Sequence, residues 1–494
     1  MNTTQSTLPL WACLVSLAAV VPIVLCRRHP NRREFFTLLA GFIKVALVAS
    51  MLPAILKGKT VEFTIWQILP NLAIQFRVDA FGILFALVAS SLWIVTSIFS
   101  VGYMRSLKEH SQTRFFAFFA VALSATVGVA FSANLFTLYL FYEMLSLSTY
   151  PLVTHHQDKE ARTGGRTYLT YLMGTSIGFV LPALIFCYIR TGGEMNFSSA
   201  GFLSGNLSPT EALIILLLFL FGFAKAGLMP FHSWLPGAMV APTPVSALLH
   251  AVAVVKVGVF CIVRVITGVF GVGFLEELGY GTIIAYIAAF TVIVSSLIAL
   301  TQDNLKRRLA FSTIGQLAYI ILGTALLSPI GMVGSMGHIG MHAFGKITLF
   351  FCAGAIFVST GKKYVSEMVG IGKRMPVTMI AFLIGSLSVV GLPPAGGLWS
   401  KLYLVWGSIE TEQFVFAVVY LVSSLLNAVY FFPIVFRAFF CKPEDSMFPG
   451  KAQESNRFCV TALSVTAVCS VALFFWPAPF FTLANMMSNQ LFHP

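Results

Sequence analysis

Long apolar stretches separated by short polar segments dominate this 494-residue chain. A helix that crosses the hydrocarbon core of a bilayer, which is roughly 30 Å thick, needs about 20 apolar residues. Because the apolar stretches are unbroken rather than alternating, they exclude a closed β-barrel and predict an all-α integral membrane protein. About fourteen transmembrane helices are expected, near residues 8–26, 35–56, 79–102, 113–131, 133–154, 166–189, 210–228, 243–268, 281–300, 308–327, 330–359, 376–391 with 395–408, 413–439 and 458–481.

Two polar intervals between these stretches have different patterns. Residues 61–77 alternate polar and apolar side chains around Pro70 and Asn71, which predicts a short hairpin or loop outside the membrane. Residues 190–209 are rich in Gly, Ser and Asn, so an ordinary loop is expected there. No positively charged segment precedes the first apolar stretch, so that stretch is expected to be kept as a helix rather than cleaved.

The composition indicates that lipid is the main solvent, because 57% of the residues are hydrophobic and only 10% are charged. The formal charge of +13 could suggest nucleic acid, but the basic residues are scattered between apolar stretches. No nucleic-acid partner is therefore expected. The eight cysteines occur without any C-x-x-C spacing, which favours apolar packing over the alternative of a metal or redox cluster.

Lysine and arginine are distributed unequally between alternate connecting segments. One set of alternate loops contains 21 of them, whereas the opposite set contains only Lys57, Lys59, Arg77 and Arg190. Cytoplasmic loops retain positive charge during insertion, so the first set is expected in the cytoplasm and both termini outside it. The lack of a transit peptide favours a bacterial inner membrane.

Several charged side chains lie inside the apolar stretches, where each costs about 2.5–3.5 kcal/mol on insertion scales and usually marks an ion pathway. Lys44 and Arg264 lie nearer the expected helix ends, so their side chains are expected to reach the headgroups. Glu143 is far from either end of its helix. It is expected either to carry protons or to hold helices together in a static ion pair.

Lys225 precedes Pro230 by about one turn, and proline removes a backbone donor and breaks a helix. A broken helix at membrane depth is tolerated where it lines a cavity or is covered by protein, so Lys225 is expected to meet water. Desolvation favours the neutral amine, and a nearby carboxylate favours the ammonium. A Glu143–Lys225 pair whose separation varies could therefore load and release one proton.

Two further helices carry titratable residues at regular spacing. His250 and Lys256 are six residues apart, or about 9 Å along one helix, which suits relay through water. A plain hydrogen-bonding role is the alternative for His250. His338, His342 and Lys346 stand at i, i+4 and i+8 and share one helix face. No carboxylate or thiol completes a metal-ligand set, so a relay is favoured over a metal site.

Small residues accompany the histidine face, and they are expected to leave room for water: Gly334, Ser335, Gly337 and Gly340. A second interrupted helix contains Pro393 and Pro394 ahead of Lys401. Its run GLPPAGGLWS resembles the run AGLMPFHSWL around Pro230, because both contain Gly-Leu-x-Pro followed by Trp. This similarity indicates two related halves. Paired interrupted helices in corresponding halves point to a transport site.

Four stretches carry a resemblance to a known family: FYEMLSLSTYPLV, AGLMPFHSWLPGAMVAPTPVSALLHAVAVVKVGVF, DNLKRRLAFSTIGQLAYI and GLPPAGGLWSK. They resemble the antiporter-like subunits of respiratory complex I, of membrane-bound hydrogenases and of Mrp-type multisubunit sodium/proton antiporters. The resemblance covers about residues 114–430. Overall, the chain looks most similar to the D subunit of the Mrp type, although Lys401 departs from complex I subunits that have glutamate there.

The resemblance implies three N-terminal helices in 1–112, inverted five-helix repeats in 113–268 and 281–439, and a C-terminal loop and helix in 440–494. It also implies that Asp303 and Lys306 form the acidic-basic start of the tenth helix. The resemblance implies relay roles for Glu143, Lys225, His250, Lys256, His338, His342 and the exit residue Lys401. The helix face adds Lys346 to the predicted relay, and the prolines predict helix breaks at Pro230, Pro393 and Pro394.

The leading hypothesis is a proton-translocating subunit of an Mrp-like cation/proton antiporter that works with other membrane subunits and exchanges protons for Na⁺ or K⁺. The alternative is a subunit of a redox-driven pump of the complex I or hydrogenase type. A third possibility is a self-sufficient carrier of a small solute. The chain contains no G-x-G-x-x-G, no G-x-x-x-x-G-K-[ST] and no cysteine cluster, so no cofactor or metal is expected in it.

Overall fold

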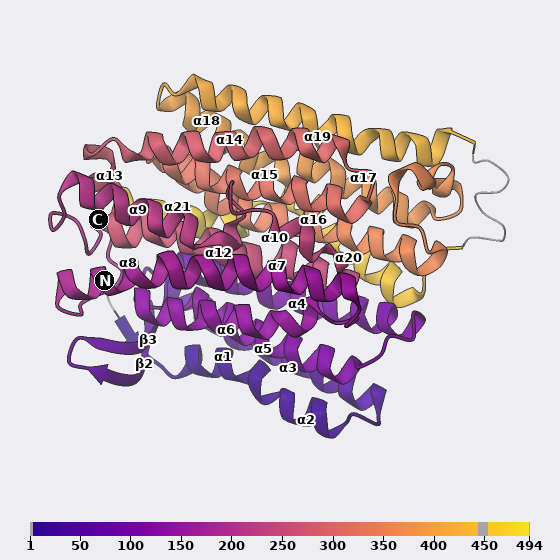
Figure 1. The fold of residues 1–494 in the computed structure, drawn as a ribbon, viewed down its shortest axis with the longest axis horizontal. Helices are drawn as coiled ribbons and strands as arrows, with labels where there is room; N and C mark the ends of the chain where they lie inside the picture. Colours follow the sequence, from indigo (N-terminus) through magenta and orange to yellow (C-terminus); the bar gives the residue numbers. More distant parts are fainter. Residues whose placement is uncertain (1–2, 443–452, 494) are drawn as a thin grey trace.

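The computed structural model describes residues 3–442 and 453–493 and consists of helices that run roughly side by side (Figure 1). Every range predicted to span the membrane contains helix, which confirms the fold class. The helices are α1 (Leu8–Ala18), α2 (Val20–Leu25), α3 (Pro30–Leu56), α4 (Ala80–Ser106), α5 (Gln112–Ala130), α6 (Leu135–Val153), α7 (Lys159–Thr175), α8 (Leu181–Thr191), α9 (Pro209–Gly222), α10 (Trp234–Gly237), α11 (Thr243–Ala251), α12 (Val254–Arg264), α13 (Val272–Glu277), α14 (Tyr280–Thr301), α15 (Leu305–Ala325), α16 (Pro329–Thr360), α17 (Pro376–Val390), α18 (Gly397–Glu410), α19 (Phe414–Phe440), α20 (Arg457–Phe475) and α21 (Ala478–Phe492).

Nine helical segments in the described part of the chain are long and apolar enough to cross a membrane. They are the pair α1–α2, α3, α4, α5, the pair α7–α8, α14, α16, α19 and α20. Helices α9 and α17 are apolar but shorter. Because several of the other expected spans are interrupted, the total of about fourteen stays a prediction.

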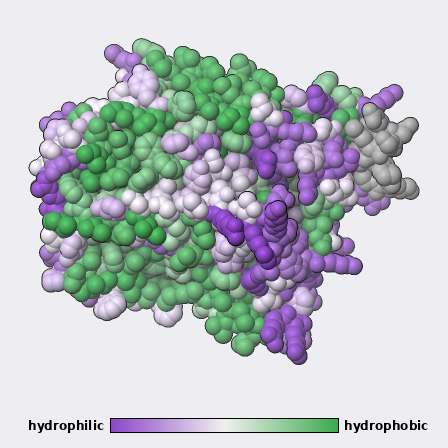
Figure 2. Space-filling model, in the orientation of Figure 1, coloured by the Kyte–Doolittle hydropathy of each residue, from purple (hydrophilic) through white to green (hydrophobic). Residues whose placement is uncertain are grey.

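The outer surface of the bundle is apolar, as a surface in contact with lipid must be. Figure 2 shows apolar side chains over most of one face, with hydrophilic side chains gathered toward one end of the molecule. On α19, the side chains of Leu421, Leu425 and Phe436 are exposed along the outside of the helix. Such residues would be costly to expose to water, so they identify the band that lipid covers.

A small sheet lies at the end of the molecule that holds both termini (Figure 1). Strand β1 (Thr3–Gln5) pairs in parallel with β2 (Thr60–Leu69), and β2 pairs antiparallel with β3 (Leu72–Val78). The hairpin predicted within residues 61–77 is therefore present, with Pro70 and Asn71 at its turn. The sequence pattern did not predict β1.

Helix α16 forms the centre of the second half of the chain. Almost every residue between Gly331 and Ile356 is buried, because α4, α11, α15, α17, α18, α20 and α21 all pack against this helix. A helix that is apolar on all sides belongs in the core of a bundle. The polar side chains of α16 are consequently enclosed by protein rather than by lipid.

The first interrupted helix breaks earlier than its proline predicts. Helix α9 ends at Gly222, and Lys225 lies in a short 3₁₀ turn, η2 (Ala224–Ala226), instead of one turn before the break. Gly227 follows with a φ of +71°, a left-handed conformation that glycine adopts without strain. Pro230 lies beyond this turn, so the helix has already ended before the proline is reached.

The second interrupted helix consists of α17 and α18, with Pro393 and Pro394 between them. Three other predicted helices are also broken, which the sequence analysis did not predict. The range 8–26 contains α1 and α2, which are separated at Ala19. Helix α11 stops at Ala251 and α12 starts at Val254, because the Ala253 amide donates to the Leu248 carbonyl five residues back. The expected last span, 458–481, is instead α20 followed by α21, with Pro477 at the junction.

Gly258 sets the distance between α12 and the 3₁₀ turn η2. A Cβ atom there would lie 2.1 Å from the Ala226 nitrogen and 2.4 Å from the Lys225 carbonyl carbon. These are backbone atoms, which cannot rotate away. We expect Gly258→Ala to lower stability by about 1–3 kcal/mol or more, the usual cost of overpacking, measured as the thermal unfolding midpoint in detergent.

Gly174→Ala on α7 is the matched control, because apart from the chain neighbours and the backbone of α7 itself no atom of the described residues lies within 4 Å of the added methyl group. Its unfolding midpoint should match that of the unaltered protein. Equal losses in the two variants would contradict the close approach of α12 and η2.

Candidate functional site

Four buried lysines belong to the predicted relay: Lys225, Lys256, Lys346 and Lys401. Their exposed fractions are 0%, 0%, 0% and 6%. None of them takes part in an ion pair within residues 3–442 and 453–493. An unpaired charge in a dry interior is costly, so the protonation of these amines responds strongly to any change in nearby charge.

Lys225 is held against α6 by neutral groups. Its Nζ donates to the Tyr142 carbonyl at 3.0 Å and to Ser146 Oγ at 2.6 Å, and it lies 3.0 Å from the centroid of the Tyr142 ring. Glu143, the next residue along α6, accepts a hydrogen bond from the Ser176 hydroxyl instead. Its other carboxylate oxygen, Oε2, is buried and has no hydrogen-bond partner in the described residues.

Glu143 and Lys225 thus bind different partners and form no direct ion pair in the described chain. The alternative of a static ion pair at Glu143 receives no support from this arrangement. A pair that meets only at some stage of a cycle stays a prediction.

One direct contact between predicted relay residues joins α12 to α16. Lys256 Nζ lies 2.8 Å from His342 Nδ1, and the His342 Nε2 atom is buried without a partner in the described residues. The His342 ring stacks on His338 with 5.6 Å between centroids. Lys256 was predicted to act with His250 on one continuous helix, but the side chain of His250 lies outside the described residues and the helix is broken between the two positions.

His338 is hydrogen-bonded through both ring nitrogens. Its Nδ1 lies 2.8 Å from Ser400 Oγ, and its Nε2 lies 3.1 Å from Gln316 Oε1. An amide oxygen only accepts, so Nε2 donates to Gln316. The Ser400 hydroxyl also donates to the Gly397 carbonyl at 3.2 Å. The ring also stacks on Tyr319 at 5.7 Å.

Lys401 also contacts Tyr319. Its Nζ is 4.7 Å from the Tyr319 ring centroid and donates to Ser424 Oγ at 2.9 Å and to the Val390 carbonyl at 3.2 Å. The Tyr319 hydroxyl is itself 3.3 Å from Ser424 Oγ. We call the series Lys256, His342, His338, Tyr319 and Lys401 the buried polar line.

Lys346 shares the helix face of the two histidines, but its side chain turns toward α15. Its Nζ donates to Ser312 Oγ at 2.7 Å, and the same oxygen accepts from the Tyr430 hydroxyl at 2.9 Å. Lys346 is therefore a branch beside the buried polar line. Sequence reasoning missed Gln316, although an amide inside an apolar stretch is a detectable signal, and it missed Tyr319, Ser400 and Ser424, whose residue types carry none.

The small residues of α16 do not leave room for water, which corrects the prediction. A Cβ at Gly337 would lie 2.8 Å from the Phe481 ring, and one at Gly340 would lie 2.8 Å from the Phe480 ring. Gly334 is covered in the same way by Leu404 of α18. These glycines allow α18 and α21 to pack closely, as small residues do at helix interfaces in membranes.

Lys44 and Arg264 were predicted to reach the headgroups, but the structure shows that both side chains bind protein groups instead. Lys44 is fully buried near the middle of α3 and donates to the Leu123 carbonyl at 3.2 Å. Arg264 is 5% exposed and binds both carboxylate oxygens of Asp79, at 2.6 and 2.7 Å. Protein groups satisfy both cations, so neither side chain needs to extend to the lipid surface.

Two cavities open toward the ends of the bundle. One, of 310 Å³, lies beside Lys306, whose Nζ donates to the Ala241 carbonyl at 2.6 Å just before α11. Asp303 does not pair with Lys306 and accepts hydrogen bonds from Ser366 instead. The other cavity, of 390 Å³, lies at the end with the sheet and contains the Asp79–Arg264 pair.

The fold and the buried titratable side chains define a polytopic membrane subunit of the antiporter-like type. The chain belongs to the family described as NADH:quinone oxidoreductase/Mrp antiporter, TM, whose sequence model matches residues 132–427. This finding confirms the predicted superfamily. Several members of the family are subunits of multisubunit membrane complexes.

Two relatives and one solved structure show the range of this family. NADH-quinone oxidoreductase subunit N of Desulforudis audaxviator is 32% identical, over 83% of this chain and 81% of that protein. Na(+)/H(+) antiporter subunit A1 of Staphylococcus haemolyticus is 29% identical over 97% of this chain, which spans 65% of that longer protein. A chain in the structure of the Mrp complex from Dietzia sp. DQ12-45-1b has a TM-score of 0.88 at 21% identity, covering 99% of this chain and 97% of that chain.

Proposed function

We propose that this chain is a proton-translocating component of an Mrp-type monovalent cation/proton antiporter, similar to the D subunit of that type, and that it works with other membrane subunits. The observation that carries the proposal is the 2.8 Å contact between Lys256 and His342. It joins the end of the proposed first repeat, residues 113–268, to the middle of the proposed second repeat, residues 281–439. Protons that reach Lys256 then have a line of ring and hydroxyl groups to Lys401.

The proposed cycle depends on electrostatic coupling between buried groups. Two unit charges 4 Å apart interact by about 4 kcal/mol at an effective dielectric constant of about 20. Approach of the Glu143 carboxylate would hold a proton on Lys225, and its withdrawal would release the proton toward Lys256. A change in a neighbouring subunit can drive this step by shifting the local potential. His250 and Lys346 are assigned supporting positions in the same relay.

The proposed orientation follows the distribution of charge. The end of the bundle with the basic loops and the Lys306 cavity would face the cytoplasm of a bacterial cell, and both termini would face the other side. Water entering the Lys306 cavity reaches the start of α11, which leads toward Lys256. The cations exchanged are proposed to be Na⁺ or K⁺.

A redox-driven complex is the second candidate, because NADH-quinone oxidoreductase subunit N is 32% identical over 81% of its length. In that case, electron transfer in partner subunits would supply the energy. The relay within this chain would be the same, since both kinds of complex need only a change in local charge to move the proton.

The test uses inside-out membrane vesicles from cells that express the chain with its native partner subunits in an antiporter-deficient host. After respiration sets up a pH gradient, addition of NaCl or KCl should dissipate it, as reported by a pH-sensitive fluorophore. Vesicles without this chain should not respond. Failure of both salts, together with proton uptake on addition of an electron donor, would replace the antiporter by the redox-driven pump. Subunits that copurify in mild detergent should agree with the transport result.

A further inference from the structure

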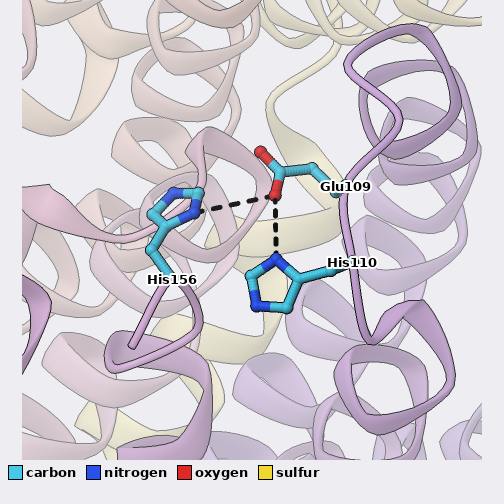
Figure 3. Close-up of side chains that lie close together, drawn as sticks. All are labelled: Glu109, His110 and His156. Carbon is cyan, nitrogen blue, oxygen red and sulfur yellow. Dashed lines mark ion pairs between the residues drawn. The ribbon is translucent and has the colours of Figure 1, made fainter. Parts of the chain in front are cut away.

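A cluster of one carboxylate and three imidazoles lies at the end of the bundle with the basic loops. Glu109 and His110 lie between α4 and α5, and His156 lies between α6 and α7 (Figure 3). His155 precedes His156 in the same connecting segment. The ligand atoms of Glu109, His110 and His156 lie within 4.8 Å of one another. We propose that this cluster is a binding site for a divalent transition-metal ion, with Zn²⁺ as the best match.

The distances fit a metal centre with small adjustments. Glu109 Oε2 lies 3.9 Å from His110 Nδ1, 3.7 Å from His155 Nε2 and 3.6 Å from His156 Nδ1. Zn²⁺ binds imidazole nitrogen and carboxylate oxygen at about 2.0–2.2 Å, which places neighbouring ligands of a tetrahedron roughly 3.4 Å apart. The ligand atoms of Glu109, His110 and His156 are at most 4.8 Å apart, so side-chain shifts of about 1 Å would bring them around one ion. Mg²⁺ and Ca²⁺ prefer oxygen ligands, so they fit this donor set poorly.

His155 is the independent sign that a ligand is needed. Its side chain is fully buried, and neither ring nitrogen has a hydrogen-bond partner among the described residues. A buried imidazole without a partner is costly, and coordination of Nε2 would remove that cost.

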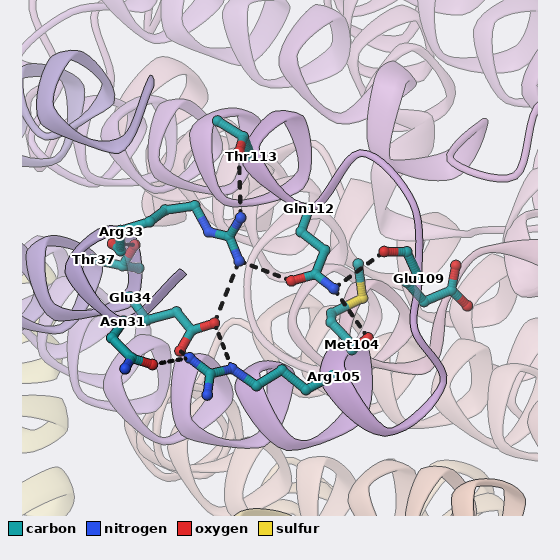
Figure 4. A network of polar contacts seen from close by, with 9 residues as sticks. All are labelled: Asn31, Arg33, Glu34, Thr37, Met104, Arg105, Glu109, Gln112 and Thr113. Atoms are coloured by element: carbon teal, nitrogen blue, oxygen red, sulfur yellow. Dashed lines mark hydrogen bonds and ion pairs between the residues drawn. The ribbon is translucent and has the colours of Figure 1, made fainter. Parts of the chain in front are cut away.

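Both loops are held in place before any ion binds. Gln112 Nε2 donates to the carbonyls of Met104 and Glu109, and Gln112 Oε1 accepts from Arg33 at 2.8 Å (Figure 4). These bonds fix the segment that carries Glu109 and His110 against α3. On the other loop, Arg114 donates to the His155 carbonyl at 2.9 Å. A prepared geometry of this kind lowers the entropy lost when a ligand binds.

The site has a path to solvent and a direct connection to the Lys306 cavity. His110 is about half exposed, with 49% of its side chain accessible, so an ion can enter from the surface. His156 also lines the 310 Å³ cavity, together with Glu160 and Lys306. A bound ion would tie the α4–α5 loop to the α6–α7 loop beside that cavity. The binding proposal itself does not depend on the proposed transport function.

The alternative is an ion-pair cluster in which Glu109 only accepts hydrogen bonds from protonated histidines. Metal binding distinguishes the two, because a proton-only cluster has no reason to hold one dication at fixed stoichiometry. The two histidines of α16 could also bind a metal ion. Variants of the loop residues are therefore needed to assign the bound ion to the loop cluster.

The experiment uses the full-length chain in mild detergent, purified with a tag that contains no histidine and stripped with a chelator. Titration with Zn²⁺ by calorimetry, and with Co²⁺ by visible absorption, should reveal one site per chain that the His110→Ala/His156→Ala double variant lacks. Loss of a single supporting partner weakens metal binding by about 10–100-fold. Loss of two ligands should therefore weaken it at least about 100-fold.

Glu109→Gln and His155→Ala serve as second variants, since the Glu109 backbone bond to Gln112 survives the first change. Each should weaken Zn²⁺ binding without altering the elution profile of the folded protein. His493→Ala, at an exposed position, is the control and should bind normally. Unchanged Zn²⁺ stoichiometry and affinity in the double variant would overturn the proposal.

Discussion

Replacing Lys225 with alanine is expected to abolish cation-dependent proton exchange while the complex still assembles. The amine of Lys225 makes its hydrogen bonds to neutral oxygens of α6 and stands beside Glu143 without an ion pair in the described residues. The variant lacks the amine that would accept the proton in the proposed cycle. In the unaltered protein this amine is carried by η2, which follows α9. The measurement is the initial rate of fluorescence recovery after NaCl addition, per assembled complex.

Lys44→Met is the matched control, because Lys44 is equally buried but contacts the Leu123 carbonyl and the Trp93 ring. It lies away from the buried polar line, so its loss should leave the exchange rate within a factor of about two. Lost assembly of the Lys225→Ala variant, with a normal rate in the complexes that survive, would show that Lys225 only holds helices together.

Breaking the Lys256–His342 contact is expected to have the second largest effect. A hydrogen bond to a charged group contributes about 1.5–3 kcal/mol, which corresponds to roughly 10- to 150-fold in a rate if the proton must cross that contact. His342→Leu removes the acceptor of Lys256 and also the ring that stacks on His338. We therefore expect a decrease of at least about 10-fold in the exchange rate, measured in the same vesicles.

A double-mutant cycle with Lys256→Met provides the control for this second prediction. Residues that act as one unit show strongly non-additive effects, so the double variant should be no slower than the slower single variant. Independent multiplication of the two losses would mean that Lys256 and His342 act in separate steps. The direct relay between the two proposed repeats would then be wrong.

The hydrophobic pattern was sufficient to predict the fold class and the position of nearly every helix, because lipid demands about 20 apolar residues for each crossing. The pattern failed to predict features of the fold that depend on contacts between helices. The break between α11 and α12 involves no proline or glycine at Val252 or Ala253, and its visible sign is the hydrogen bond from the Ala253 amide to the Leu248 carbonyl. Lys44 was misplaced for a similar reason, since its burial depends on the packing of α3 against α5.

The residues of the candidate site could be predicted from the sequence, but the contacts between their side chains could not. Helical spacing placed His338 and His342 on one face, and the structure shows their rings stacked. Spacing within a helix carries no information on which side chain of another helix lies opposite. Lys256 was therefore assigned to His250 rather than to His342, and Tyr319 was not considered between His338 and Lys401.

A cryo-electron microscopy structure of the intact complex, at a resolution that shows ordered water, tests the central claim most directly. Proton transfer along buried side chains requires hydrogen-bonded water wherever two groups are too far apart to touch. We expect water molecules between Lys225 and Lys256, and from Lys401 to the opposite end of the bundle. Continuous dry packing of side chains across either interval would contradict the proposed pathway.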